Sequence, residues 1–139
     1  MKKKNFGFTL LELLVVISII GLLVAMGAVA FTTAQQRGRD SKRRGDMQAL
    51  QKAYEQYYAE NGSYSATCDT MATAHIPGGS PTDPKSSQTY TKNCESIAYC
   101  ACALLEDTGN GNSAVPAALS TACDYPGTPK DYYCVSNLQ

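Results

Sequence analysis

The sequence predicts an α+β protein: a long N-terminal helix, membrane-spanning in its first half, packed on a small antiparallel sheet that is stapled by disulfides. An apolar run follows a cationic N-terminus, a helical stripe continues beyond it, and all six cysteines come later, among strand-like patterns. We therefore expect a short leader at 1–7, a hydrophobic helix at 8–34, its amphipathic continuation at 35–61 and an extracytoplasmic β head with variable loops at 62–139.

Charge is unevenly distributed along the chain. The 139 residues carry 12 basic and 12 acidic side chains, yet an excess of six positive charges lies up to Lys52 and an excess of six negative charges follows. This overall balance disfavours a dedicated nucleic-acid binder, which is normally basic over its whole domain. The head is short enough for its core to need disulfide staples.

The first element is apolar from Leu13 to Phe31, with one hydroxyl and no charge. At about 1.5 Å per residue it matches the ~30 Å of a bilayer core. Lysines at positions 2 to 4 precede it, and the positive-inside rule then places the N-terminus in the cytoplasm. A secretory signal peptide explains the same pattern, with a cleavage site at Ala28-Val29-Ala30. The mature chain would then be a secreted, disulfide-rich binding domain cut after Ala30.

Two features weigh against a signal peptide. Glu12 lies at the start of the apolar run, where an ionised acid needs a partner or a function. The helical pattern also continues past residue 30 as an apolar stripe, formed by Met47, Leu50, Tyr54, Tyr57 and Tyr58. One helix is therefore expected from about Phe8 to about Glu60, ending at Gly62, which can take a left-handed conformation.

Two strands are expected in the head, Ile97 to Leu104 and Tyr132 to Ser136, after a turn-rich loop from Pro77 to Pro84. Three disulfides of about 2–4 kcal/mol each are expected among the six cysteines, with fifteen possible pairings: Cys68, Cys94, Cys100, Cys102, Cys123 and Cys134. Cys100 and Cys102 share one face of the first strand and should bond to different partners. A zinc site is disfavoured because the chain has one His and no C-x-x-C pair.

Other side chains invite functional interpretations. The segment from Glu106 to Asn112 is rich in oxygen ligands but lacks EF-hand spacing, so a polar turn is expected and Asp107, Asn110 and Asn112 form a weak calcium candidate. No other cofactor is expected. A basic group should form salt bridges between packed helices or stay solvated, with DNA phosphates as a lesser alternative; it comprises Arg37, Arg39, Lys42, Arg43 and Arg44. No catalytic constellation appears, so the protein is not expected to be an enzyme.

The Lys-rich leader followed by Gly7-Phe8-Thr9-Leu10-Leu11-Glu12 and an unbroken apolar stretch resembles the class III signal of type IV pilins and type II secretion pseudopilins. The resemblance implies the type IV pilin fold, cleavage by prepilin peptidase between Gly7 and Phe8, and N-methylation of Phe8. It also implies that Glu12 pairs with the Phe8 amine of a neighbouring subunit during assembly. A bond between Cys123 and Cys134 would close the C-terminal loop, as in many pilins.

The resemblance implies a structural subunit of a type IV pilus, used for adhesion, motility or DNA uptake, or else the major pseudopilin of a type II secretion or competence system. Expected partners are further copies bound through their N-terminal helices, prepilin peptidase, an assembly platform and its ATPase. The chain would cross the cytoplasmic (inner) membrane once before joining an extracellular filament. Because Val29 stands where the best-known pilins carry proline, we expect at most partial loosening of the helix between Gly21 and Gly27.

Overall fold

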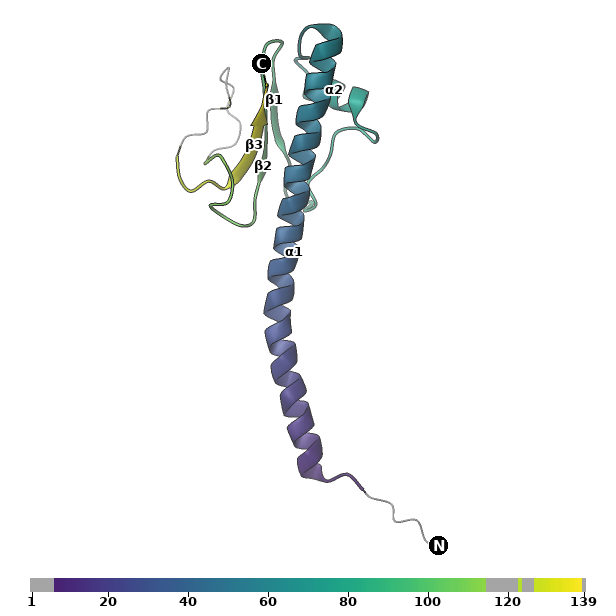
Figure 1. The fold of residues 1–139 in the computed structure, drawn as a ribbon, viewed down its shortest axis with the longest axis vertical. Helices are drawn as coiled ribbons and strands as arrows, with labels where there is room; N and C mark the ends of the chain where they lie inside the picture. The colour runs from purple at the N-terminus through teal and green to yellow at the C-terminus, as the bar shows by residue number, and fades with distance from the viewer. Residues whose placement is uncertain (1–6, 115–122, 124–126, 139) are drawn as a thin grey trace. The chain divides into compact units, whose positions relative to one another are not determined.

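The computed structural model describes residues 7–114, 123 and 127–138. Its elements are α1 (Leu10–Asn61), α2 (Cys68–His75), β1 (Thr91–Cys94), β2 (Tyr99–Leu104) and β3 (Tyr132–Ser136) (Figure 1). The predicted long helix and last strand are confirmed, and the other predicted strand begins at Tyr99 rather than Ile97. Neither α2 nor β1 was expected. The chain divides into two compact units, Met1–Gln35 and Gln36–Gln139, and α1 contributes to both.

In the first unit, α1 is unbroken through Gly21, Gly27 and the Ala28-Val29-Ala30 sequence. Signal-peptide cleavage after Ala30 would therefore cut inside a helix. Every residue of this unit from Gly7 onward is exposed. By length and composition α1 contains a stretch able to cross a membrane.

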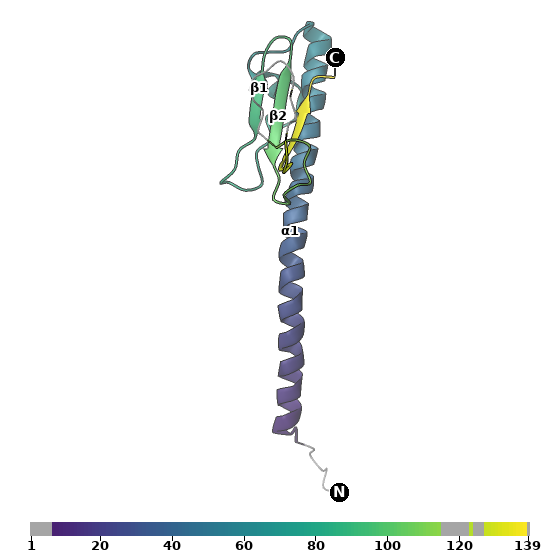
Figure 2. The same cartoon turned by 90° about the vertical axis from the view of Figure 1, so that its left-hand side faces the viewer.

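In the second unit, β2 is the central strand of a three-stranded sheet, with β1 and β3 antiparallel on either side (Figure 2). The register places Thr91 opposite Cys102 in one pair and Cys102 opposite Cys134 in the other. The predicted alternation of faces is confirmed. Tyr99, Ala101 and Ala103 belong to the main core, whereas Cys100 and Cys102 belong to a separate cluster with Cys134.

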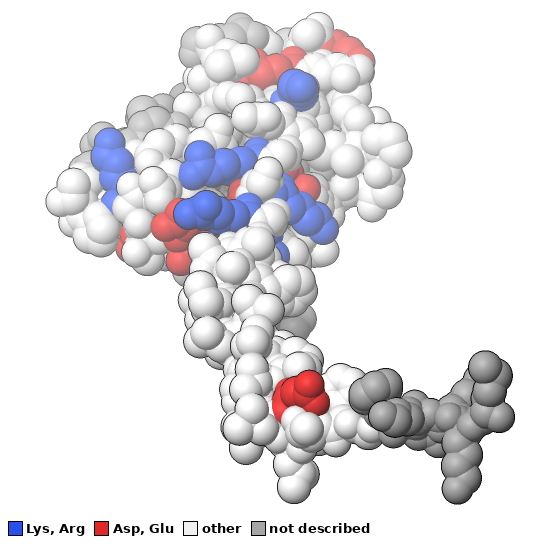
Figure 3. Space-filling model, turned by 60° about the horizontal axis from the view of Figure 1, so that its bottom comes forward, with Lys and Arg blue, Asp and Glu red and all other residues white. Residues whose placement is uncertain are grey.

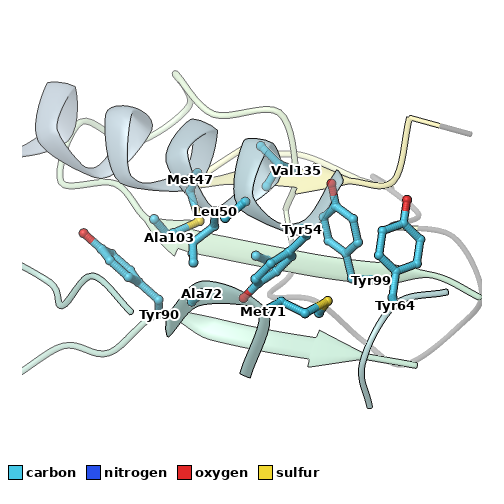
Figure 4. Packing of buried hydrophobic residues seen from close by; sticks show 12 residues of the cluster. Met47, Leu50, Tyr54, Tyr64, Met71, Ala72, Tyr90, Tyr99, Ala103 and Val135 are labelled. Atoms are coloured by element: carbon cyan, nitrogen blue, oxygen red, sulfur yellow. The ribbon is translucent and has the colours of Figure 1, made fainter. Parts of the chain in front are cut away.

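The core of the head lies between the second half of α1 and the sheet (Figure 4). Met47, Leu50 and Tyr54 are fully buried, and they pack with Tyr99 of β2 and Val135 of β3. Helix α2 adds Met71 and Ala72 to the same cluster. The stripe predicted on the helix thus packs on the predicted sheet.

Local contacts end helix α1 and cover part of the free edge of strand β3. Gly62 has a φ of +74° and its N–H donates to the carbonyl of Tyr58 at 2.7 Å, so the glycine ends α1 as expected. At β3 the side chain of Asn112 acts as a short strand partner: it accepts from Cys134 N at 2.7 Å and donates to Cys134 O at 2.8 Å. This amide pairs backbone groups that an edge strand would otherwise leave open.

Three disulfides link the described cysteines: Cys68–Cys94, Cys100–Cys123 and Cys102–Cys134. Cys100 and Cys102 bond to different partners, as predicted. The predicted bond between Cys123 and Cys134 is wrong. Cys134 lies directly opposite Cys102 in the sheet, with a Cα–Cα distance of 4.1 Å, so it bonds across the strands and leaves Cys123 to Cys100.

Candidate functional site

The start of α1 holds the residues singled out for processing and assembly. Gly7, Phe8 and Thr9 precede the first helical residue, and the Phe8 side chain is 81% exposed. A Cβ placed on Gly7 would have open space around it. The peptide bond between Gly7 and Phe8 therefore lies outside the helix, with open space beside Gly7. A protease needs such access to a scissile bond.

Glu12 caps its own helix, a role that was not predicted. Its Oε2 accepts from Thr9 N at 2.9 Å and from Thr9 Oγ1 at 2.8 Å, while Glu12 N donates to Thr9 Oγ1 at 3.3 Å. This is the reciprocal capping box that the spacing Thr9-x-x-Glu12 encodes. Both side-chain bonds go to Oε2, and a carboxylate has capacity for about four. Glu12 can therefore cap the helix and still accept a cation from outside.

The apolar first half of α1 has no partner within the described part of the chain. Sixteen large apolar side chains between Phe8 and Phe31 are exposed. Burying side chains of this size is worth about 1.5–3 kcal/mol each, so this surface represents on the order of 20–50 kcal/mol of unused burial. An exposed apolar surface of this extent indicates a lipid or protein environment.

The guanidinium of Arg43 is fully buried and uses all five of its N–H donors. Nε and Nη2 form a bidentate pair with Asp83 at 2.8 and 2.9 Å, and Nη1 donates to Asp40 at 2.8 Å and to Glu106 at 2.9 Å. Nη2 also donates to Gln88 at 2.9 Å. A lysine ammonium has three donors and no planar fork, so it could form neither the bidentate pair with Asp83 nor all five of these bonds.

Two further cations complete this group, which we call the Arg43 cluster. Arg39 pairs with Glu106 through two bonds at 2.6 and 2.7 Å, and Lys85 reaches the same carboxylate at 2.9 Å. Asp40 also accepts from the backbone N–H of Glu106 at 2.9 Å, fixing the turn after β2. The cluster comprises Arg39, Asp40, Arg43, Asp83, Lys85, Gln88 and Glu106, three cations balanced by three anions.

The cluster lowers the pKa of two of its acids, Glu106 and Asp83. The Arg39 guanidinium, with Lys85 and Arg43, holds the pKa of the Glu106 carboxyl well below its usual range. Burial opposes ionisation of Asp83, but hydrogen bonds from Arg43 keep the pKa of that carboxyl lowered. Both groups therefore remain ionised in the folded head. The cluster ties α1 to the loop around Asp83 and to the turn after β2.

These contacts correct the expectation for the basic group. Arg43 has no exposed surface and Arg39 is paired with Glu106, and their acidic partners come from the same chain rather than from a neighbouring helix. Arg43 is thus not available to DNA phosphates. Arg44 donates to the carbonyl of Asn110 at 2.5 Å and lies 5.2 Å from the ring centre of Tyr133. The cluster could not be predicted from the sequence because two of its acids, Asp83 and Glu106, are far from the helix in the chain.

A second unpredicted contact group centres on Glu55 of α1. Its Oε1 accepts from the hydroxyls of Tyr99 at 2.8 Å and Tyr64 at 3.0 Å, and from the backbone N–H of Leu138 at 3.0 Å. Burial, reinforced by the bond to Glu55, raises the pKa of the Tyr99 and Tyr64 hydroxyls. Glu55 therefore fastens three segments of the head to one helical position.

The calcium candidate loop is engaged in protein contacts. The side-chain amide of Asn112 is hydrogen-bonded to the backbone of Cys134, and the carbonyl of Asn110 accepts from the guanidinium of Arg44. Asp107 donates its backbone N–H to Asp40 at 2.9 Å. Among the described residues, no three His, Cys, Asp or Glu side chains are grouped so that they could hold a metal ion. Calcium binding at Asp107, Asn110 and Asn112 stays a prediction.

Comparison with known proteins bears on the helix start first. Residues 2–28 match the family model described as the prokaryotic N-terminal methylation motif. This stretch contains Gly7, Phe8 and Glu12.

Three curated proteins resemble longer parts of the chain. The type IV major pilin protein PilA of Myxococcus xanthus is 37% identical over 62 residues, which are 45% of this chain and 28% of PilA. Type II secretion system core protein G of Pseudomonas aeruginosa is 29% identical over 58% of this chain and 57% of its own length. Type II secretion system core protein G of Aeromonas hydrophila is 33% identical over 48% of this chain and 46% of its own length. The chain thus spans less than three fifths of each relative, and no solved structure matches it.

Proposed function

Because the chain belongs to the family of type IV pilins and type II secretion pseudopilins, we propose that it is the repeating structural subunit of a type IV pilus. The members it resembles are structural proteins and not enzymes. The subunit would be held in the membrane by the first half of α1 and then polymerise through the same helix. The resulting surface filament would serve adhesion, motility or DNA uptake.

One observation carries this proposal above the others. The apolar segment of α1 is exposed over its whole length in the single chain, and its surface needs an environment of lipid or of other apolar helices. A filament subunit meets both in turn, first the bilayer and then its neighbours. A secreted domain would have no use for the segment after export.

The helix start supplies the chemistry of assembly in this proposal. Cleavage between Gly7 and Phe8 creates a new amine, and the carboxylate of Glu12 lies one helical turn further along. Its bonds to Thr9 leave acceptor capacity for the Phe8 amine of a neighbouring subunit. In apolar surroundings such a pair of opposite charges favours one register between neighbouring helices. Prepilin peptidase, an assembly platform and an ATPase are the partners that this route requires.

A pseudopilin is the second candidate, favoured by two relatives that are core proteins of type II secretion systems. Electron microscopy of filaments sheared from cells that express the chain at its natural level separates the two. A pilin should give long external fibres that contain this chain. Their absence, with the chain retained in the cell envelope, would favour the pseudopilin.

The role of Glu12 in assembly can be separated from its role in capping. Glu12→Gln keeps a side chain that completes a capping box but removes the charge, whereas Thr9→Ala keeps the charge and removes the hydroxyl that makes two of the three capping bonds. We expect filaments to fail with Glu12→Gln and to persist with Thr9→Ala, while cleavage, followed by mass, proceeds in both. Normal filaments from Glu12→Gln would show that charge pairing is not the function of Glu12.

A further inference from the structure

The basic side chains that lie outside the Arg43 cluster stand directly after the apolar segment. Arg37 follows Ala34 by three residues, and Lys42 and Arg44 come within the next two turns of α1. Arg37 and Lys42 are exposed and form no ion pair among the described residues. An open groove of about 380 Å³ is lined by two of these cations, Arg37 and Arg44, together with Asp40, Ser41, Asp107 and Asn110. Lys and Arg side chains spread over the width of the head in Figure 3.

These three cations are arranged around the helix rather than on one face. At about 100° per residue, Arg44 projects within roughly 20° of Arg37, whereas Lys42 projects roughly 140° away. The buried positions Asp40, Arg43 and Met47 occupy the sector between them on the side of the sheet. A single rigid partner would contact only one flank of this arrangement. A surrounding layer of small anions would contact both.

We propose that Arg37, Lys42 and Arg44 form a basic collar that binds the phosphate groups of anionic lipids before the subunit enters a filament. These lipids would lie at the extracytoplasmic surface of the membrane that α1 spans. This inference rests on the proposed function, because it requires α1 to span the membrane. The collar extends about 10 Å along the helix, and the headgroup layer on each side of a bilayer is about 5–8 Å thick. Lys and Arg at this depth are attracted to anionic headgroups.

The Arg43 cluster determines which basic side chains belong to the collar. Arg39 and Arg43 follow the same apolar segment, but their charges are neutralised by Asp40, Asp83 and Glu106 within the head. Arg37 and Lys42 are left exposed for lipid. Arg44 is held by the carbonyl of Asn110 and the ring of Tyr133 but has no acidic partner among the described residues. Folding of the head thus selects which cations of this basic stretch face the membrane surface.

Two lysines of α1 provide a matched test without any substitution. Lys42 lies in the collar, and Lys52 lies ten residues further on; both are exposed. The full-length chain is reconstituted in vesicles of phosphatidylcholine alone or with one third phosphatidylglycerol, and acetylation by a neutral reagent is followed by mass spectrometry. We expect acetylation of Lys42 to slow at least threefold in the anionic vesicles and to recover at high salt, because the contact is electrostatic. The rate at Lys52 should change by less than half as much.

The other outcomes overturn the proposal. Equal rates at Lys42 in the two vesicles would show that the collar does not bind anionic lipid. Protection that follows protein density rather than lipid charge would assign the surface to a second copy, and protection by an added DNA duplex in neutral vesicles but not by anionic lipid would assign it to DNA. A chain that fails to float with neutral vesicles would instead refute membrane insertion, and with it the proposed function. Arg37→Gln should weaken the protection of Lys42, whereas Lys52→Gln should leave it unchanged.

Discussion

Replacing Arg43 by alanine should destabilise the head by about 3–5 kcal/mol, the range for removing one partner from a buried ion pair. The substitution leaves the buried carboxylate of Asp83, with 1% of its side chain exposed, without the two bonds that pair it. It also removes one bond each from Asp40, Glu106 and Gln88.

The magnitude follows from which acids keep a partner. Glu106 retains Arg39 and Lys85, and Asp40 retains the backbone N–H groups of the turn after β2. Among the residues that the structure describes, Asp83 keeps only the backbone N–H of Lys85. The loss of stability should therefore come mainly from the carboxylate of Asp83, which is left buried without a charged partner. Summing five charged hydrogen bonds at about 1.5–3 kcal/mol each would overestimate it.

The assay is urea unfolding of the full chain in detergent micelles with its disulfides intact. The chain has nine tyrosines and no tryptophan, so near-UV circular dichroism of tyrosine reports on the head. With a dependence of about 1–3 kcal/mol per molar urea, the midpoint should fall by roughly 1–5 M. Arg37→Ala is the matched control and should shift it little, because Arg37 is exposed. A loss below about 1 kcal/mol for Arg43→Ala would refute the structural role of the cluster.

Three further predictions concern the head. The stability of the head should fall as the pH drops below about 4.5, because Glu106 and Asp83 have lowered pKa values in the folded state and take up protons on unfolding. Each group contributes at most about 1.4 kcal/mol per pH unit, and solvent screening reduces this slope. Urea unfolding at pH 7 and at pH 3 measures the difference. Asn112→Ala should cost about 1–3 kcal/mol in the same assay, because it leaves the N–H and C=O of Cys134 unpaired, and an unchanged midpoint would count against the strand-edge role. Non-reducing peptide mapping should recover Cys102 linked to Cys134, and a Cys123–Cys134 peptide would contradict the sheet register.

The sequence allowed prediction of those elements whose pattern is local. The helix shows an apolar run, a stripe at helical spacing and a glycine stop, and the last strand is bounded by turn residues. Strand β1 has the sequence Thr91-Lys92-Asn93-Cys94, which lacks apolar alternation; it forms through pairing with β2, and the bond to Cys68 holds its end. Helix α2 is too short to be stable alone, and packing of its two buried residues, Met71 and Ala72, in the core stabilises it.

The candidate site was predictable only in part for the same reason. Gly7, Phe8 and Glu12 belong to one short motif, so their proximity follows from the sequence. The Arg43 cluster and the cysteine pairing depend on contacts between residues far apart in the chain, such as Arg43 with Asp83 and Cys102 with Cys134. Strand register and loop placement decide those contacts, and no local pattern encodes them.

The mature N-terminus tests the central claim most directly. Intact mass and N-terminal sequencing of the chain purified from its native cell envelope should identify Phe8 as the first residue, carrying one added methyl group. The seven residues before it, which include all three leader lysines, should be absent. A mature chain that begins at Phe31 would contradict the filament-subunit account and favour a secreted domain.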